Sequence, residues 1–434
     1  MQTELQLILS STLLHSSANE LESINKLLPE VEDWQALTHL LIGNTCAPLV
    51  YKKIQSLPNV AIIPKESLAL LRKAYYTTVS RSSLMYAEFS RVVELFQQNN
   101  INFIALKGIY LCEWLYQDIG LRQFSDIDLL VKEEDATKAM QLLTEAGYFQ
   151  HDAVHGLSNF VDAVSTKEGL DFTHFEAFTK NNISIEIHLK LSPDKHNDRY
   201  RLDVPELFHK SVVTTINSQQ ISVLHPYDLL IHIAIHTDLH FRHGQIQFTC
   251  FNDLVNLLER FKTDFNWEEF IARCKQFNCE KAVFTHLIVV NKYYNAYLPP
   301  HIIERYANLP IDTVENQFLS YLKGETYKIV SKTAVGGHLQ SLKSIQSVPV
   351  LLRYLKEVLF PGKAFMISKY GLQTTDDGHH TMDNRRQTTD NGEETHHHII
   401  TSKYWWLLYP YRWYCGIKGI FYIITNTNHL KKQK

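Results

Sequence analysis

The feature that most constrains this chain is a run of alternating residues that reads Phe-Ser-Asp-Ile-Asp-Leu-Leu-Val. A period of two is typical of a β-strand, in which successive side chains point to opposite faces. Ile127, Leu129 and Val131 are therefore expected on one face, and Asp126 and Asp128 on the other. Carboxylates at this spacing lie roughly 7 Å apart at their Cα atoms, which is close enough to share divalent metal ions. The run predicts a metal site on the polar face of a strand, and an ordinary surface strand is the alternative.

A strand-to-helix turn precedes this run. Residues 103–106 are strand-like, and Lys107 and Gly108 separate them from an apolar helix. Glycine at such a turn lets the backbone approach a ligand, and the first turn of the helix offers free N–H groups to an anion. Lys107 would add a point charge for a phosphate. The turn predicts a phosphate site, whereas an ordinary helix start is the simpler alternative.

A third acid lies on a later strand. Two β-type runs, at residues 171–178 and 183–189, flank the sequence Thr-Lys-Asn-Asn and predict a hairpin. In the second run Ser184, Glu186 and His188 alternate with apolar residues and share one face. This face would bring a carboxylate and an imidazole to the side of the sheet where the aspartate pair can meet them. A solvated strand face is the alternative, because antiparallel sheets often expose one side.

Together these segments resemble the uncharacterised nucleotidyltransferase family, a divergent branch of the polymerase-β-like nucleotidyltransferase superfamily. The resemblance covers roughly residues 30–300, with a weaker echo to about residue 420. The residues that carry it are Lys107-Gly108, Gly120-Leu121-Arg122, the strand from Ser125 to Val131, Gly147-Tyr148, the segment from Ile185 to His188, Pro226 to Leu230, His236, His240 and Asp253-Leu254.

The resemblance implies an α+β fold, in which N- and C-terminal helical regions flank a small mixed β-sheet nucleotidyltransferase core. It implies an enzyme that transfers a nucleoside monophosphate from a triphosphate, expected to be ATP, to a small-molecule, peptide or protein acceptor. In the superfamily two strand aspartates and a later acid bind two magnesium ions. These catalytic and metal-binding roles carry onto Asp126, Asp128 and Glu186, and a role of Glu186 as a base is the alternative. The superfamily's usual Gly-Ser turn is Lys107-Gly108 here, so the serine contact to phosphate is missing.

Further candidates surround these acids. The residues expected to bind the nucleotide are those of the turn and those that flank the acids, namely Lys107, Gly108, Arg122, Ser125 and His188. A long helix is expected at about residues 66–99, and its polar face carries Arg72, Lys73, Arg81 and Arg91. These charges either lie near the triphosphate or, as is more common, only solvate the helix face.

A row of histidines follows the predicted sheet. His232, His236 and His240 recur every four residues on one face of a predicted helix. Histidines at i and i+4 can chelate one metal ion, but the third would lie about 12 Å from the first. A polar helix face is therefore favoured over a zinc site. The resemblance indicates that His236, His240 and Asp253 line the nucleotide or acceptor cleft.

Two other functions fit the same residues. A cleft of this kind can transfer the γ-phosphoryl group instead, because positioning and metal charge dominate both reactions. The chain would then be a kinase-like phosphotransferase. A non-catalytic nucleotide- or partner-binding protein is the third hypothesis, and the presence of all three acids counts against it.

Four regions are expected along the chain. They are an N-terminal helical region at residues 1–99, the catalytic domain at 100–225, a helical domain at 226–330 and a C-terminal extension at 331–434. In the catalytic domain Asp135 is expected to cap the start of a helix that Gly147 ends. In the extension, a flexible polar loop is expected near residues 373–398, followed by an aromatic run at 404–414.

Composition fits such an enzyme. The chain has 434 residues, of which 45% are hydrophobic and 21% charged, as is typical of a globular protein of two or three domains. The formal net charge of −3 argues against general nucleic-acid binding, which needs a basic surface. The six cysteines include no Cys-x-x-Cys pair, and the sequence has neither a basic leader nor an apolar run of about 18 residues. A cytoplasmic protein without a transmembrane segment is therefore expected.

Overall fold

The computed structural model describes most of the chain up to residue 323 and little beyond it. The described residues are 2–150, 177–192, 200–242, 248–294, 296–323, 359–360, 409–410 and 413–414. The chain divides into two compact units, one formed by Met1–His151 with Phe160–Lys332 and the other by Asp152–Asn159 with Thr333–Lys434. All elements named below belong to the first unit. The loop predicted near residues 373–398 and most of the aromatic run lie outside the described residues.

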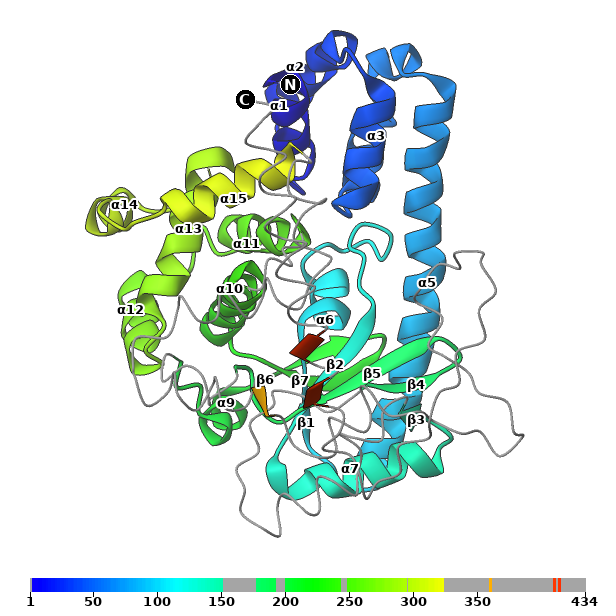
Figure 1. Cartoon of the computed structure of the whole chain (residues 1–434), viewed down its shortest axis with the longest axis vertical. Helices are drawn as coiled ribbons and strands as arrows, with labels where there is room; N and C mark the ends of the chain where they lie inside the picture. The colour runs from blue at the N-terminus through cyan, green and yellow to red at the C-terminus, as the bar shows by residue number, and fades with distance from the viewer. Residues whose placement is uncertain are drawn as a thin grey trace. The chain divides into compact units, whose positions relative to one another are not determined.

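Helices form the N-terminal region (Figure 1). They are α1 (Gln2–Ser11), α2 (Ala18–Leu27), α3 (Trp34–Gly43), α4 (Ala47–Ile54) and α5 (Lys65–Gln98), with short 3₁₀ turns at Leu28–Glu30 and Pro58–Ile62. Ser17 and Glu20 form a capping box that satisfies backbone N–H groups at the start of α2. The long α5 packs against α3 and α4 at one end and reaches the central sheet at the other (Figure 1).

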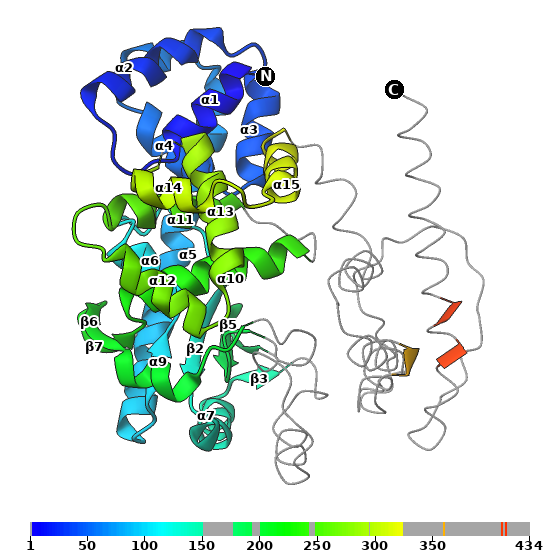
Figure 2. The same cartoon turned by 90° about the vertical axis from the view of Figure 1, so that its left-hand side faces the viewer.

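Seven strands form one mixed sheet beside α5 (Figures 1 and 2). They are β1 (Phe103–Ala105), β2 (Asp126–Val131), β3 (Phe149–Gln150), β4 (Phe178–Lys180), β5 (Ile183–His188), β6 (Val212–Ile216) and β7 (Gln219–Val223). Their order across the sheet is β3-β4-β5-β2-β1-β7-β6. The interior strands β2 and β5 run parallel, whereas β1 is antiparallel to β2. This sheet, flanked by helices, confirms the predicted α+β class.

In the described part of the chain, the helices between these strands are α6 (Lys107–Trp114), α7 (Glu133–Glu145) and α9 (Val204–Lys210). The end of α7 is as predicted, since Gly147 follows its last residues with a φ of +83°, which suits glycine. The predicted start was wrong. The helix begins after Lys132, so Asp135 lies in the first turn. There its charge favours the positive end of the helix dipole without capping a backbone N–H group.

The predicted hairpin has a tighter turn than expected. The strands β4 and β5 are joined by Asn181 and Asn182 alone, both with positive φ angles of 51° and 61°. Two residues in this conformation match the right-handed twist of the strands, and asparagine tolerates it better than most residues. Most of the run predicted at residues 171–178 lies outside the described residues.

A helical region follows the sheet and packs beside it (Figure 2). Its helices are α10 (Pro226–Arg242), α11 (Phe248–Arg260), α12 (Trp267–Gln276), α13 (Glu280–Tyr294), α14 (Pro300–Tyr306) and α15 (Asp312–Leu322). Buried aromatic side chains hold these helices together, and the ring of Phe251 packs 4.7 Å from that of Phe318. Among the helices that the structure describes, none is both long and apolar enough to cross a membrane.

Candidate active site

Strand register brings the predicted acids to one face of the sheet. The parallel pairing of β2 with β5 sets Asp128 directly beside Glu186, and Asp126 beside Ser184. Because alternate residues of a strand share a face, the carboxylates of both strands point to the same side. Asp126 and Glu186 are partly exposed, whereas Asp128 is buried.

Asp128 is the centre of a polar cluster. Its Oδ1 atom lies 2.9 Å from Nζ of Lys107 and 2.7 Å from Nε2 of His188. The same His188 nitrogen lies 3.5 Å from Oε2 of Glu186. Lys107 reaches this position from the turn after β1, while His188 ends β5 and is buried. Side chains from the turn after β1 and from β5 therefore meet at one carboxylate oxygen of β2.

The charges of this cluster shift its pKa values in opposite directions. Burial alone would raise the pKa of Asp128, but Lys107 and His188 beside it hold that pKa well below its ordinary value. Burial, and then the charges of Asp128 and Glu186, raise the pKa of Asp126 to about 6. Burial opposes the charge on Lys107, yet its acidic neighbours raise its pKa above the ordinary value. The surroundings thus stabilise the charged form of Asp128, whereas burial and the acidic neighbours disfavour the charged form of Asp126.

The donor set fits a divalent cation. One ligand atom each from Asp128, Glu186 and His188 lies within 4.8 Å of the other two. Asp126 contributes a further carboxylate on the same face. Oxygen-rich sites of this kind suit hard cations such as Mg²⁺ or Mn²⁺.

The Lys107-Gly108 turn has an unusual backbone. Lys107 adopts a φ of +44°, a left-handed conformation that is uncommon outside glycine. Position 108 has no room for a side chain, because a Cβ atom there would lie 2.6 Å from Cβ of Phe124. The first N–H groups of α6 follow directly, where an anion is favoured.

The turn and the three acids line a cleft of about 680 Å³, which is a volume typical of a small-ligand site. Its lining includes the predicted residues Lys107, Gly108, Arg122, Ser125, Asp126, Asp128, Glu186, His236, His240 and Asp253. His188, which was predicted to bind the nucleotide, is buried and is not among the lining residues. Polar residues of α5, among them Thr78 and Arg81, form another part of the wall. Arg81 donates a hydrogen bond of 3.1 Å to the backbone oxygen of Ser125.

The sequence itself matches one protein family. The family model described as uncharacterised nucleotidyltransferase matches residues 30–295, which is more than half of the chain. The chain belongs to this family. The matched span contains the whole described sheet and every residue of the cleft. No curated protein and no solved structure matches the chain significantly.

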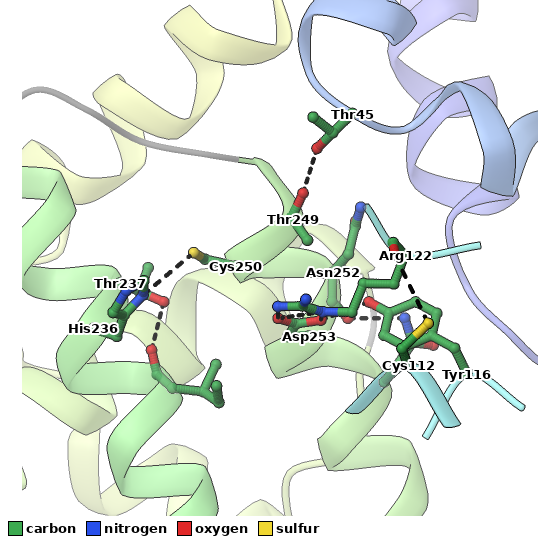
Figure 3. Close-up of polar contacts among 12 residues, drawn as sticks. Thr45, Cys112, Tyr116, Arg122, His236, Thr237, Thr249, Cys250, Asn252 and Asp253 are labelled. Carbon is green, nitrogen blue, oxygen red and sulfur yellow. Dashed lines mark hydrogen bonds and ion pairs between the residues drawn. The ribbon is translucent and has the colours of Figure 1, made fainter. Parts of the chain in front are cut away.

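One wall of the cleft contains a buried ion pair (Figure 3). Arg122 donates from Nε to Oδ1 of Asp253 at 2.9 Å and from Nη2 to Oδ2 at 2.7 Å. The hydroxyl of Tyr116 donates to the same Oδ1 at 2.7 Å. Arg122 was predicted to bind the nucleotide, and Asp253 to line the nucleotide or acceptor cleft. Tyr116 was not predicted, because nothing in its local sequence marks it as a partner of Asp253.

Two histidines of the row, His236 and His240, line the same cleft. Nε2 of His236 and Nε2 of His240 lie 3.0 Å apart. Sγ of Cys250 lies 3.9 Å from Nδ1 of His236 (Figure 3). His232 is buried, and burial together with the charge of Lys107 lowers its pKa to about 3. Among the described residues, the group that could hold a metal ion is that of Asp128, Glu186 and His188, and it does not include these histidines.

Another contact at the cleft could not be anticipated from sequence. The hydroxyls of Thr45, from the turn between α3 and α4, and Thr249, near the start of α11, form a short hydrogen bond (Figure 3). Both residues line the cleft, and Thr45 has a φ of +59°, which is rare for a β-branched residue. The N-terminal helices therefore form part of the site.

Proposed function

We propose that this protein is a metal-dependent nucleotidyltransferase that moves a nucleoside monophosphate from a triphosphate to a small-molecule, peptide or protein acceptor. The observation that carries the proposal is the pairing of Asp128 with Glu186 across two parallel strands, with Asp126 on the same face. Membership of the nucleotidyltransferase family supports it. Magnesium is the expected metal, because carboxylate oxygens suit Mg²⁺. ATP is the expected nucleotide.

The acids and the metal would provide the chemistry. Asp126, Asp128 and Glu186 would hold a divalent ion, which would supply positive charge to the reacting phosphate and acidity to the acceptor hydroxyl. His188 holds Asp128 by its Nε2 contact at 2.7 Å and keeps that carboxylate in one orientation. Glu186, which is partly exposed in the cleft, is also available to accept the proton of the acceptor.

The turn and its neighbours would hold the triphosphate. Lys107 uses one of its three N–H donors on Asp128, and the others are available to phosphate oxygens. Arg122 binds Asp253 through Nε and Nη2, and in the described part of the chain its Nη1 donates to no acceptor. This Nη1 borders the turn, because a Cβ atom on Gly108 would lie 3.0 Å from it. Asp253 thereby orients a guanidinium toward the place where the phosphates are expected.

The remaining wall would receive the acceptor. It consists of hydroxyls and imidazoles, including Thr45, Thr249 and the pair His236 and His240. The pKa of His236 is well below its ordinary value because of burial and the charge of Lys107, so this imidazole is uncharged at neutral pH. Such a surface, in a chain with a net charge of −3, favours a small or peptide acceptor over a polynucleotide.

The test is label transfer. The protein is incubated with Mg²⁺, cell extract and each of the four nucleoside triphosphates, labelled either at the α- or at the γ-phosphate. Transfer of α-label with release of pyrophosphate is expected, and it should disappear in Asp128→Asn but persist in Glu134→Gln, an exposed acid on α7. Transfer of γ-label would instead indicate a kinase-like phosphotransferase. No transfer of either label to any species, with nucleotide still bound, would favour a binding protein.

A further inference from the structure

One oxygen of Asp128 is already fully engaged within the protein. Oδ1 accepts from Lys107 at 2.9 Å and lies 2.7 Å from Nε2 of His188. A carboxylate offers about two lone-pair positions on each oxygen, so these two contacts use those of Oδ1. Only Oδ2 is left for a cation. An aspartate that bridges two metal ions normally gives one oxygen to each ion. Asp128 has only Oδ2 to give, so it can bind one ion in this way.

Lys107 is held in this position by its backbone and its surroundings. Its left-handed φ of +44° is costly for a residue with a Cβ atom and persists only where the surrounding structure enforces it. Its side chain is 15% exposed, and the neighbouring Asp126 and Glu186 also attract its charge. The ammonium is therefore a fixed positive charge among the three acids rather than a mobile surface group.

The charges of the site match one divalent ion. Three carboxylates carry three negative charges, and Lys107 neutralises one of them. His188, whose Nε2 lies 2.7 Å from Oδ1 of Asp128, offsets a second one when it is protonated. The negative charge that remains is at most two, and a single divalent ion balances it. A second divalent ion would lie beside an ammonium in a largely buried site, where like charges repel strongly.

We infer that Lys107 takes the place of one of the two metal ions that the family resemblance implies, so that Asp126, Asp128 and Glu186 hold a single divalent ion. The inference rests on the proposed function, because it assumes that these acids bind metal for catalysis. It gives Lys107 a role at the reaction centre, where its charge balances the acids and faces the substrate phosphates.

The experiment counts bound manganese without measuring activity. The full-length protein is dialysed to equilibrium against Mn²⁺ and a non-hydrolysable triphosphate analogue. The excess of manganese and of analogue in the protein compartment then gives ions per chain. The variants are Lys107→Met, which removes the charge, Lys107→Arg, which keeps it, and Arg81→Met, which removes another cation of the cleft wall. Thermal unfolding of each variant checks that it is folded.

The expected result is one ion per wild-type chain, one in Lys107→Arg and Arg81→Met, and two in Lys107→Met. Mn²⁺ binding to Lys107→Met in the absence of the analogue should also be roughly tenfold tighter or more, because a repelling charge is gone. Two ions per wild-type chain would overturn the inference and leave the proposed function intact. The inference would also be overturned if folded Lys107→Met bound one manganese ion per chain with the same affinity as the wild type. No manganese in the wild type at millimolar concentration would contradict the proposed metal-dependent function itself, and the inference with it.

Discussion

Arg122 and Asp253 lie 131 positions apart in the sequence and form a buried, two-point ion pair in the wall of the cleft. Arg122 follows α6, close to the expected phosphate site, whereas Asp253 belongs to α11 of the helical region. The pair therefore connects the sheet with the helices that complete the cleft. Arg122 engages both carboxylate oxygens of Asp253, and the hydroxyl of Tyr116 donates a further hydrogen bond to Oδ1.

Removing Asp253 should destabilise the protein strongly. In Asp253→Ala the guanidinium of Arg122 stays buried without its partner, and breaking such a pair typically costs about 3–5 kcal/mol. Urea denaturation should show this loss in the free energy of unfolding. Glu268→Gln, which breaks the exposed contact of Glu268 with Arg305 at 3.0 Å, is the control and should change little. Similar stability of Asp253→Ala and the wild type would show that the pair contributes nothing.

Asp126→Asn should raise the stability of the metal-free protein above pH 6. The pKa of Asp126 is about 6 in the folded state against an ordinary 3.8, so the folded state holds its proton more tightly. Stability is then greatest below pH 3.8 and falls as the pH rises through 6, by up to about 3 kcal/mol. Asparagine removes this penalty. Melting temperatures in EDTA should favour the variant at pH 8, and the difference should shrink toward pH 4.

Asp128→Asn should have the opposite effect on stability and should abolish transfer. Repulsion between the two aspartates alone would predict a more stable variant. However, the pKa of Asp128 is well below its ordinary value, because Lys107 and His188 stabilise its charge. Losing that charge leaves Lys107 without its closest partner, so the melting temperature in EDTA at pH 8 should fall. Near-normal transfer by this variant with magnesium would contradict a metal-binding role of Asp128.

Gly108→Ala should destabilise the turn before α6. The new Cβ atom would lie 2.6 Å from Cβ of Phe124, and overpacking of this kind costs about 1–3 kcal/mol. The matched control is Gly43→Ala at the end of α3, because Gly43 lines the same cleft and a Cβ atom added there would meet nothing within 4 Å among the described residues. Thermal unfolding compares the two variants. Equal melting temperatures would mean that Phe124 can move aside.

Lys107→Ala should weaken triphosphate binding while it strengthens binding of the metal. A contact between an ammonium and a phosphate is worth on the order of 1–3 kcal/mol, which corresponds to a loss of roughly 5- to 150-fold in affinity. Calorimetric titration of a non-hydrolysable triphosphate at two salt concentrations measures the effect, which should be larger at low salt. Equal affinities of variant and wild type at both concentrations would mean that Lys107 does not contact the phosphates.

The local elements of this protein were largely predictable because their signals lie between neighbours in the sequence. Alternation of polar and apolar residues predicted β2 and β5, and the glycine at position 147 predicted the end of α7. The same alternation assigned Asp126 and Asp128 to one face, since side-chain direction in a strand depends only on parity. Family resemblance then indicated Glu186 as the third acid, on a strand some sixty residues later. The neighbouring contact of Asp128 with His188 spans 60 positions of the sequence.

Tertiary structure decided how these elements combine. Sequence does not fix the register of β2 on β5, the ion pair of Arg122 with Asp253, or the contact of Thr45 with Thr249, which spans 204 positions. Each depends on packing between distant segments, for which short-range periodicity carries no information. The position of Lys107 is the clearest case. The place of Lys107 between a strand and a helix indicated a positive charge for a phosphate. Only the folded turn, with its left-handed backbone, directs that charge onto Asp128.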